Sequence, residues 1–523
     1  MRAQDYQISK EKFVFHNVDE RLHDKKLETK PVSYLQDAFR RFARNKASIV
    51  ATFIIGFLVL FAVFGPLLSP YQVKDKDQFY AYCLPRNEFF YKKGIHFWDG
   101  GQNKELNQKT YDEHRAIEIE IGRKVIMTNA KKVVRIEKKM GKEIEVPYYK
   151  YRLDTYSVVG AKYVLLKYED YCALQKYQDE HNVQIILPMT DPALRPVAEQ
   201  DSNNANIWYA TKLGDGRKTE IVFDENGEFI NIYWADTPSV MDDKYISKML
   251  WEEGDTKLYR YAEEKSGNMW NIRVDYYEYY KYIHDKANDG ITKPSFILGT
   301  NNYGMDIFTG LASGARFSFL LAIIVATVNL VVGAIYGAIE GYYGGKIDLI
   351  MERIVDILGS IPSMIVITLL KYHLNASHIV ILFISFFATG WVGMAARTRM
   401  QFYRFKNQEY VLVARTLGAR DRRIMFKHIF PNAIGTLITG SVLVIPGVIF
   451  SETSLSYLGI INLSTGNMTS VGTLLATGQN YLFTFPHMIL FPSIFISLLM
   501  LSFNLFGNGL RDAFNPSLRG NEE

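Results

Sequence analysis

The sequence has only two cysteines among 523 residues, and its net charge of +5 is small for that length. Two cysteines exclude a small disulfide-bonded scaffold. An apolar fraction of 48%, with 37 glycines and 16 prolines, excludes a disordered chain and a collagen-like repeat. The slight basic excess has no concentrated basic and aromatic face beside it. The composition therefore also excludes a nucleic-acid-binding protein.

The sequence also lacks the short motifs that bind nucleotides or perform catalysis. It has no P-loop lysine motif, no Gly-rich phosphate loop and no Ser-His-Asp or Cys-His order. His96, His114, His181 and His284 do not have the spacing of metal ligands. We therefore expect no enzyme activity in this chain, and no cofactor or metal bound by it.

Charge is missing from long stretches of the chain and concentrated in one block. No Asp, Glu, Lys or Arg occurs from Thr453 to Leu510. Residues 71–297, in contrast, hold 34 of the 60 basic and 37 of the 55 acidic residues, a net charge of 34 − 37 = −3. The sequence therefore predicts a membrane-embedded part and a separate soluble domain.

Uncharged apolar runs long enough to cross a bilayer indicate about six transmembrane helices, since roughly 20 helical residues span the hydrocarbon. A cleaved signal peptide is the alternative for the first run, and the long charged leader before it disfavours that reading. Residues 462–480, rich in Ser, Thr, Asn and Gly, are interpreted as a polar or re-entrant loop. The predicted runs are 48–68, 317–339, about 354–371, 372–396, 428–451 and about 485–506.

Basic residues near the ends of the runs predict the orientation. Four of them, Arg40, Arg41, Arg44 and Lys46, precede the first run, so the N-terminal segment 1–47 is expected to be cytoplasmic. Residues 397–427 hold nine Lys or Arg and lie on the same side if there are six spans. The expected C-terminal tail, 509–523, is then cytoplasmic too, and residues 71–297 lie outside the cell membrane.

Residues 71–297 are predicted to fold as an α+β domain. The turn Asp224-Glu-Asn-Gly227 predicts a hairpin, with Asn and Gly supplying positive φ angles. The block holds 23 of the 34 tyrosines, which suits either ligand binding or ordinary strand packing. The alternating stretches 131–136, 143–153, 219–223 and 229–234 are expected to be strands, and 168–181 and 242–253 helices.

Both cysteines, Cys83 and Cys172, lie in this block. A disulfide can persist outside the cell, so a bridge between them is possible. Two buried free thiols are the alternative, and the sequence leaves the two open.

Residues 397–431 are the most informative segment of the membrane part. Val411, Ala414 and Leu417 share one helical face, and Gly418 is placed to end that helix in a left-handed conformation. Asp421 can cap a second short helix that begins after it. A helix–Gly–helix hairpin with small residues suits docking into a partner's groove. A merely basic loop of a membrane protein is the alternative.

This segment resembles the EAA loop of ABC importer permeases, in the form found in C-type subunits of the oligopeptide/dipeptide/nickel family. Leu412 and Val413 stand where the general pattern has Glu and Ala, and His428 takes its Ile position. Asn301 and Asn508 replace family aspartates. Further similarity to the family follows in order at residues 298–306, 313–316, 341–348, 351–362, 452–459 and 504–516.

The resemblance implies a type I ABC importer permease fold over 311–508, with 71–297 as an insertion outside the membrane. It implies oligopeptide uptake, with a homologous B-type permease, two ATPase subunits that use ATP and Mg²⁺, and an external peptide-binding protein as partners. The residues implied to couple to an ATPase are Glu409, Tyr410, Val411, Ala414, Arg415, Leu417, Gly418, Ala419, Asp421 and Ile424.

Several alternatives remain open at this point. A dipeptide, nickel or other small-solute importer is the alternative within the family, and a membrane-anchored ligand receptor is the alternative outside it. Asp356 and Glu452 are the charges that intrude furthest on the predicted spans. Each is either functional or part of an interfacial salt bridge or helix cap.

Overall fold

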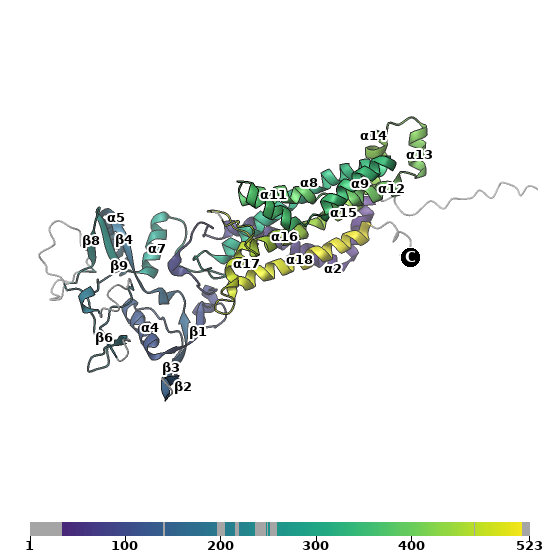
Figure 1. Ribbon diagram of the computed structural model, residues 1–523. Helices are drawn as coiled ribbons and strands as arrows, with labels where there is room; N and C mark the ends of the chain where they lie inside the picture. Colours follow the sequence, from purple (N-terminus) through teal and green to yellow (C-terminus); the bar gives the residue numbers. More distant parts are fainter. Residues whose placement is uncertain are drawn as a thin grey trace, which may run out of the picture.

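The computed structural model describes residues 34–139, 142–195, 204–214, 219–235, 247, 249–250, 259–464 and 466–514. Helices form a long bundle, and a strand-rich domain, residues 71–297, lies at one end of it (Figure 1). Part of the predicted helix 242–253 lies outside the described residues. Elsewhere among the described residues, the charge-rich block 71–297 forms the strand-rich domain and the long uncharged stretches form helices, as the charge pattern predicts.

Within the described residues, five helical segments are long and apolar enough to cross a membrane, and a bent pair makes up to six. The bent pair is α9 (Gly345–Ser360) and α10 (Ser363–His373), which meet at an angle of 75°. Ile361 between them is extended because Pro362 disfavours a helical residue before it. The five segments are Lys46–Leu68, Ile307–Tyr343, His378–Phe405, Asp421–Tyr457 and His487–Phe514.

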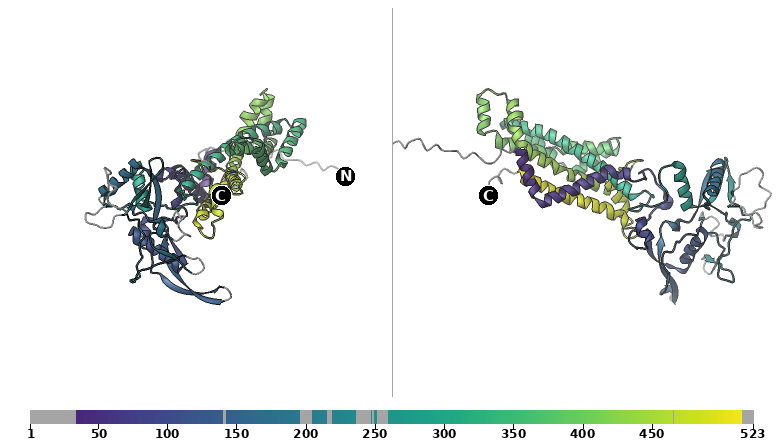
Figure 2. Two further views of the ribbon diagram at one scale, coloured as in Figure 1. Left: turned by 60° about the vertical axis from the view of Figure 1, so that its left-hand side comes forward. Right: turned by 180° about the vertical axis from the view of Figure 1, so that it is seen from behind.

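Two of these segments are built from consecutive helices. The third consists of α11 (His378–Thr389) and α12 (Val392–Phe405). The fourth runs from α14 (Asp421–Arg423) through a π-helical segment, η7 (Ile424–Ile429), into α15 (Phe430–Val442) and α16 (Val444–Tyr457). α2 (Lys46–Leu68) lies alongside α18 (His487–Phe514), as the right-hand view in Figure 2 shows.

The most extensive helix contact in the described bundle joins α8 (Ile307–Tyr343) to α12. Gly333, Gly337 and Gly341 recur every four residues on α8 and face α12. A Cβ atom at Gly337 would lie 2.1 Å from the carbonyl oxygen of Ala395. Only glycine permits this approach, which is how small residues bring membrane helices together.

A short helix, α17 (Val471–Gln479), lies within the uncharged stretch interpreted as a polar or re-entrant loop. It packs on α8, α16 and α18 rather than crossing the bundle. Glycines again permit the contact: a Cβ atom at Gly472 would lie 2.6 Å from the carbonyl oxygen of Thr453. α17 is therefore fixed to three of the long helices.

The strand-rich domain contains two main antiparallel sheets. β1 (Gly101–Asn107), β3 (Lys142–Asp154) and β2 (Lys131–Lys139) form one, in the order β1-β3-β2. In the second, β9 (Met269–Asp275) lies between β4 (Ala161–Lys167) on one side and β5 (Ile186–Leu187) and β8 (Ala262–Lys265) on the other. α5 (Tyr168–His181) and α7 (Tyr276–Ala287) pack on this sheet. The predicted α+β composition is confirmed.

Several local predictions for this domain are also confirmed. β2 and β3 cover the strands predicted at 131–136 and 143–153, and α5 has the predicted bounds. The stretch 229–234 forms only isolated bridges, to residues 190, 209 and 223. At the Asp224–Gly227 turn Gly227 has φ +81°, whereas Asn226 is not among the positive-φ residues. The expectation of two positive φ angles there is wrong, because Asp224 Oδ1 holds the turn through the amides of Asn226 and Glu228.

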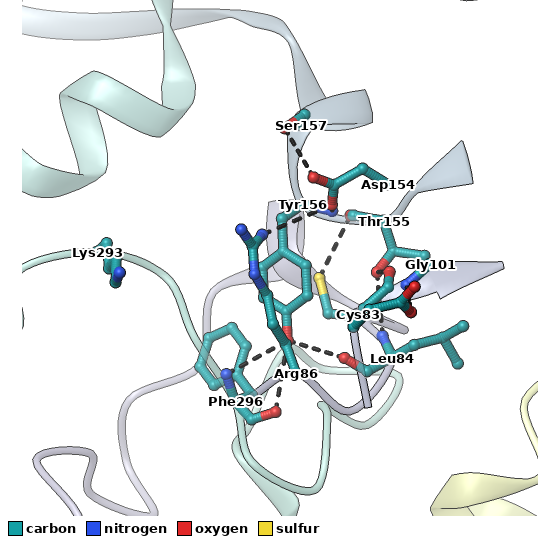
Figure 3. A network of polar contacts seen from close by, with 12 residues as sticks. Cys83, Leu84, Arg86, Gly101, Asp154, Thr155, Tyr156, Ser157, Lys293 and Phe296 are labelled. Atoms are coloured by element: carbon teal, nitrogen blue, oxygen red, sulfur yellow. Dashed lines mark hydrogen bonds and ion pairs between the residues drawn. The ribbon is translucent and has the colours of Figure 1, made fainter. Parts of the chain in front are cut away.

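The two cysteines are free thiols, so the disulfide considered from the sequence is not formed. Cys83 is buried where the two ends of the domain meet, with its Sγ 3.5 Å from the carbonyl oxygen of Thr155 (Figure 3). Burial raises the pKa of this thiol far above its usual value. Cys172 lies elsewhere, on α5.

Aromatic side chains join the strand-rich domain to the bundle. Tyr82 stacks on Phe485, with ring centroids 4.7 Å apart, and Trp98 stacks on Phe491 at 5.9 Å. His487 Nε2 lies 3.1 Å from the carbonyl oxygen of Thr300. We call the four stacked aromatic residues the aromatic clasp; it fixes the domain to the start of α18 and the loop before it.

The glycine contact between α8 and α12 gives a first prediction. Gly337→Ala should destabilise the chain by about 1–3 kcal/mol, because the new methyl group overlaps the backbone of α12. Gly393→Ala, on α12 itself, is the control, since nothing lies within 4 Å of a Cβ atom there. The melting temperatures of the purified variants provide the measurement. An unchanged melting temperature for Gly337→Ala would contradict the close contact.

Candidate coupling hairpin

Residues 409–429, which we call the coupling hairpin, lie at the end of the bundle far from the strand-rich domain (Figure 1). α13 (Glu409–Thr416) forms its first arm. Gly418 has φ +77°, and its amide donates to the carbonyl oxygen of Arg415 at 3.0 Å. The predicted left-handed end of this helix is therefore confirmed. A residue with a Cβ atom would be strained at this φ.

Asp421 has a different role from the predicted helix cap. Arg420 occupies the cap position, and Asp421 is the first residue of α14. Its Oδ1 atom accepts a hydrogen bond from the Tyr342 hydroxyl at 2.6 Å. Because Tyr342 lies near the end of α8, this bond ties the coupling hairpin to that long helix.

The roots of the coupling hairpin are buried in the chain's own core. The side chains of Val411 and Ile424 are 0% exposed, and Ala414 is 9% exposed. Val411 and Ile424 pack with Ala338, Tyr342 and Phe402. Val411 and Ala414 are therefore covered by this chain itself, and their coupling to a partner stays a prediction. These residues hold the two arms of the hairpin together.

Leu412 and Val413 on the other side of α13 are exposed and apolar, and so is Leu417, which follows the helix and does not share the buried face expected for it. The exposed fractions are 45% for Leu412, 56% for Val413 and 82% for Leu417, and we call these three residues the apolar tip. Tyr410 is 39% exposed beside them. Two members of the tip are departures from the general EAA pattern. Leu412 and Val413, apolar residues in place of the usual Glu and Ala, were the feature of the sequence that could have identified the exposed face.

The remaining predicted coupling residues surround the apolar tip. Glu409 is exposed at the start of α13. The Arg415 guanidinium lies 5.9 Å from the centre of the Tyr342 ring. Ala419 is partly buried against the core of the hairpin. The structure thus brings the predicted residues together, with some on the inner and some on the outer side.

An ion network that the sequence did not suggest supports this end of the bundle. Arg399 on α12 binds Asp348 on α9, with its Nε 2.6 Å from Oδ1. It also lies 3.3 Å from an oxygen of Glu340 on α8. The Tyr403 hydroxyl donates to Asp348 at 2.7 Å. Three helices are therefore held in fixed relation directly below the coupling hairpin.

Asp356 and Glu452, the acidic residues that lie furthest into the predicted spans, have different surroundings. Asp356 on α9 is half exposed and pairs with Arg353 at 3.2 Å, which is the salt bridge considered from the sequence. Glu452 on α16 is completely buried. It accepts hydrogen bonds from the hydroxyls of Ser318 at 2.9 Å and Ser456 at 3.1 Å. Glu452 therefore joins α16 to α8 rather than capping a helix end.

Two family models match the chain. Residues 329–520 match the binding-protein-dependent transport system inner membrane component. Residues 33–85 match the N-terminal transmembrane domain of oligopeptide transport permease C. Most of the strand-rich domain lies between these two matches. This placement fits an insertion after the first span.

Among curated proteins, the chain is similar to the oligopeptide transport system permease protein OppC of Bacillus subtilis, with 42% identity over 42% of this chain and 72% of that protein. It is 40% identical to the dipeptide transport system permease protein DppC of the same organism, over 42% of this chain and 69% of that protein. The oligopeptide transport system permease protein OppC of Haemophilus influenzae is 39% identical, over 42% of this chain and 70% of that protein.

Two valines separated by one residue test the geometry of the coupling hairpin. Val411→Ala should lower the local stability of the hairpin by about 2 kcal/mol, since two buried methyl groups are lost. Val413→Ala should change it by less than about 0.5 kcal/mol, because this side chain is exposed. Hydrogen exchange of the η7 amides measures both. Equal exchange in the two variants would contradict the assigned faces.

Proposed function

The chain belongs to the oligopeptide and dipeptide family of binding-protein-dependent ABC permeases, as a C-type subunit, and we propose that it forms half of the pathway of an ATP-driven oligopeptide importer. The observation that carries the proposal is the similarity to named peptide permeases on both sides of the insertion. The chain is a multi-pass membrane protein and a transport subunit rather than an enzyme.

The partners follow from this role. A homologous B-type permease would complete the pathway, two ATPase subunits would use ATP and Mg²⁺, and a separate protein would deliver peptides. The chain itself would bind no cofactor. The outer faces of α9 and α10 are apolar and exposed at residues such as Ile350, Ile357 and Ile365. A second permease or lipid would cover them.

The apolar tip is the part of the coupling hairpin that would enter an ATPase groove. Its three side chains are exposed, whereas the buried roots transmit force into the bundle. A movement of the tip would reach α8 through the Asp421–Tyr342 hydrogen bond and α12 through Phe402. ATP at one site and a loaded binding protein at the other would then bias the same two-state equilibrium.

The orientation that fits this mechanism has both chain ends and the coupling hairpin in the cytoplasm. The strand-rich domain would lie outside the cell, because it occupies the other end of the bundle (Figures 1 and 2). We propose that it orients the peptide-binding protein over the pathway. The aromatic clasp supports this role, since it connects the domain to α18.

Alternatives to the oligopeptide importer differ either in the transported solute or in the class of protein. A dipeptide importer is favoured by the similarity to DppC, and uptake assays with peptides of defined length distinguish it from an oligopeptide importer. A nickel or other small-solute importer is tested by the same assays with those solutes. Membership of the permease family argues against the membrane-anchored receptor.

Docking of the apolar tip on an ATPase is tested by Leu417→Asp. Placing a charge in an apolar contact should reduce ATP-dependent peptide uptake by about tenfold or more. The side chain is 82% exposed, so the chain should remain folded. Leu213→Asp, at an exposed leucine of the strand-rich domain, is the control and should leave uptake unchanged. Normal uptake by Leu417→Asp would overturn the docking role.

The role of the strand-rich domain is tested at the aromatic clasp. Tyr82→Ala combined with Trp98→Ala removes two stacked rings, each worth roughly 1 kcal/mol beyond burial. We expect weaker stimulation of ATP hydrolysis by the loaded binding protein, with basal hydrolysis retained. Phe483→Ala is the control, on the loop before α18 that carries Phe485, because the Phe483 ring is 97% exposed. Full stimulation in the double variant would contradict the orienting role.

A further inference from the structure

A cavity of about 470 Å³ lies between α12, α15 and α18, at the end of the bundle that carries the coupling hairpin. Residues three or four apart in a helix lie on the same side of it, and each helix lines the cavity with one such side. The polar lining residues with this spacing are Arg397, Gln401 and Arg404 on α12, Thr436 and Thr439 on α15, and Arg511 in the last turn of α18. The volume falls within the roughly 300–1,000 Å³ typical of small-molecule sites.

The charged side chains that line this cavity are all positive. They are Arg397, Arg404 and Arg511. Among the described residues, no carboxylate lies within ion-pair distance of any of the three. Arg399, which points to another side of α12, is in contrast paired with Asp348 at 2.6 Å. The chain therefore neutralises the arginine outside the cavity and leaves the three that line it without a described counter-charge.

Arg397 is set deeper in the bundle than Arg404. It lies eight residues before Phe405, the last residue of α12, which is about 12 Å along a helix. Its Nη1 atom donates to the carbonyl oxygen of Gly440 at 3.3 Å, and a Cβ atom at Gly440 would lie 2.6 Å from the same nitrogen. Gly440 thus leaves room for the guanidinium. A cation within a membrane-spanning helix is costly and marks a functional site, because it needs an anion or water beside it.

The remaining lining residues are neutral, and some of them are apolar. Gln401 and Thr436 offer an amide and a hydroxyl group, whereas Met400, Leu443 and Phe514 offer apolar surface. The Met400 side chain is 60% exposed, so this surface is open to a ligand. Guanidinium groups bind phosphate oxygens in a bidentate manner. A ligand that suits both kinds of surface therefore carries a phosphate joined to hydrocarbon.

We propose that the cavity between α12, α15 and α18 binds the headgroup of an anionic phospholipid. Its phosphate would pair with Arg397 and Arg404, and one of its acyl chains would lie against Met400 and Leu443. Basic pockets between membrane helices bind such headgroups on the cytoplasmic side, where anionic lipids are enriched. The assignment to the cytoplasmic leaflet rests on the proposed function, whereas the site itself does not. The bound lipid would connect α12 to α18 beside the coupling hairpin.

Native mass spectrometry of the purified full chain in detergent measures the binding. The probe is dioleoyl phosphatidylglycerol, compared with dioleoyl phosphatidylcholine, which has the same acyl chains and no net charge. The anionic lipid should bind about tenfold or more tightly, because each arginine near a lipid phosphate contributes a factor of about five. Equal affinities for the two lipids would overturn the proposal without any substitution.

Substitutions locate the site. Arg397→Gln combined with Arg404→Gln should weaken phosphatidylglycerol binding by about tenfold or more and leave phosphatidylcholine binding unchanged. Arg422→Gln combined with Arg423→Gln is the matched control, because these exposed arginines of α14 do not line the cavity. The control should retain the wild-type affinities. An equal loss in both double variants would show a general attraction to basic surface and contradict the site.

Two further measurements exclude other anions. Glycerol 3-phosphate has the phosphate without acyl chains, and if it displaced phosphatidylglycerol at equal concentration the cavity would be a free-phosphate site, which would contradict the lipid assignment. Glu522→Gln combined with Glu523→Gln removes the last two acids of the sequence and should leave lipid affinity unchanged. A gain of about fivefold or more would mean that these carboxylates compete for the arginines, and would also contradict the proposal.

Failure of this site and failure of the proposed function give different results. Selective lipid binding by a chain whose assembled importer moves no peptide would keep the site and sink the importer assignment. Peptide uptake by an importer whose chain binds both lipids equally would do the reverse.

Discussion

The close contact of α8 with α12 is the constraint on which the rest of the bundle depends. Side chains at Gly333, Gly337 and Gly341 would push the two helices apart. With the helices in contact, Tyr342 reaches Asp421 and Arg399 reaches Glu340 and Asp348. The coupling hairpin, the ion network below it and α9 therefore take their positions from one glycine-lined surface.

The two ends of the bundle are organised by different interactions. At the end with the coupling hairpin, charges and buried aliphatic groups fix the helices, and the apolar tip is left exposed. At the other end, stacked aromatic rings connect the strand-rich domain to the start of α18. Between them α17 rests on α8, α16 and α18 through glycine contacts. A force applied at either end would therefore reach the long helices through packed side chains.

Much of this could be predicted from the sequence where one local pattern decides the structure. The absence of charge located the spans, alternation located β2 and β3, and Gly418 marked the end of α13. The sequence could not show which side of α13 is buried, because Val411 and Val413 are chemically alike and the burial comes from Tyr342 and Phe402. The sequence also could not show the cavity that Arg397 and Arg511 line, because its lining residues come from separate segments of the chain.

The central claim is that this chain forms part of a pathway through which ATP hydrolysis moves peptides. The most direct measurement is uptake of a labelled peptide into proteoliposomes that contain the chain with its partner permease, two ATPase subunits and the binding protein. Our account predicts uptake that requires ATP and is lost when this chain is omitted. Steady ATP hydrolysis by the full complex without accumulation of any peptide would contradict it.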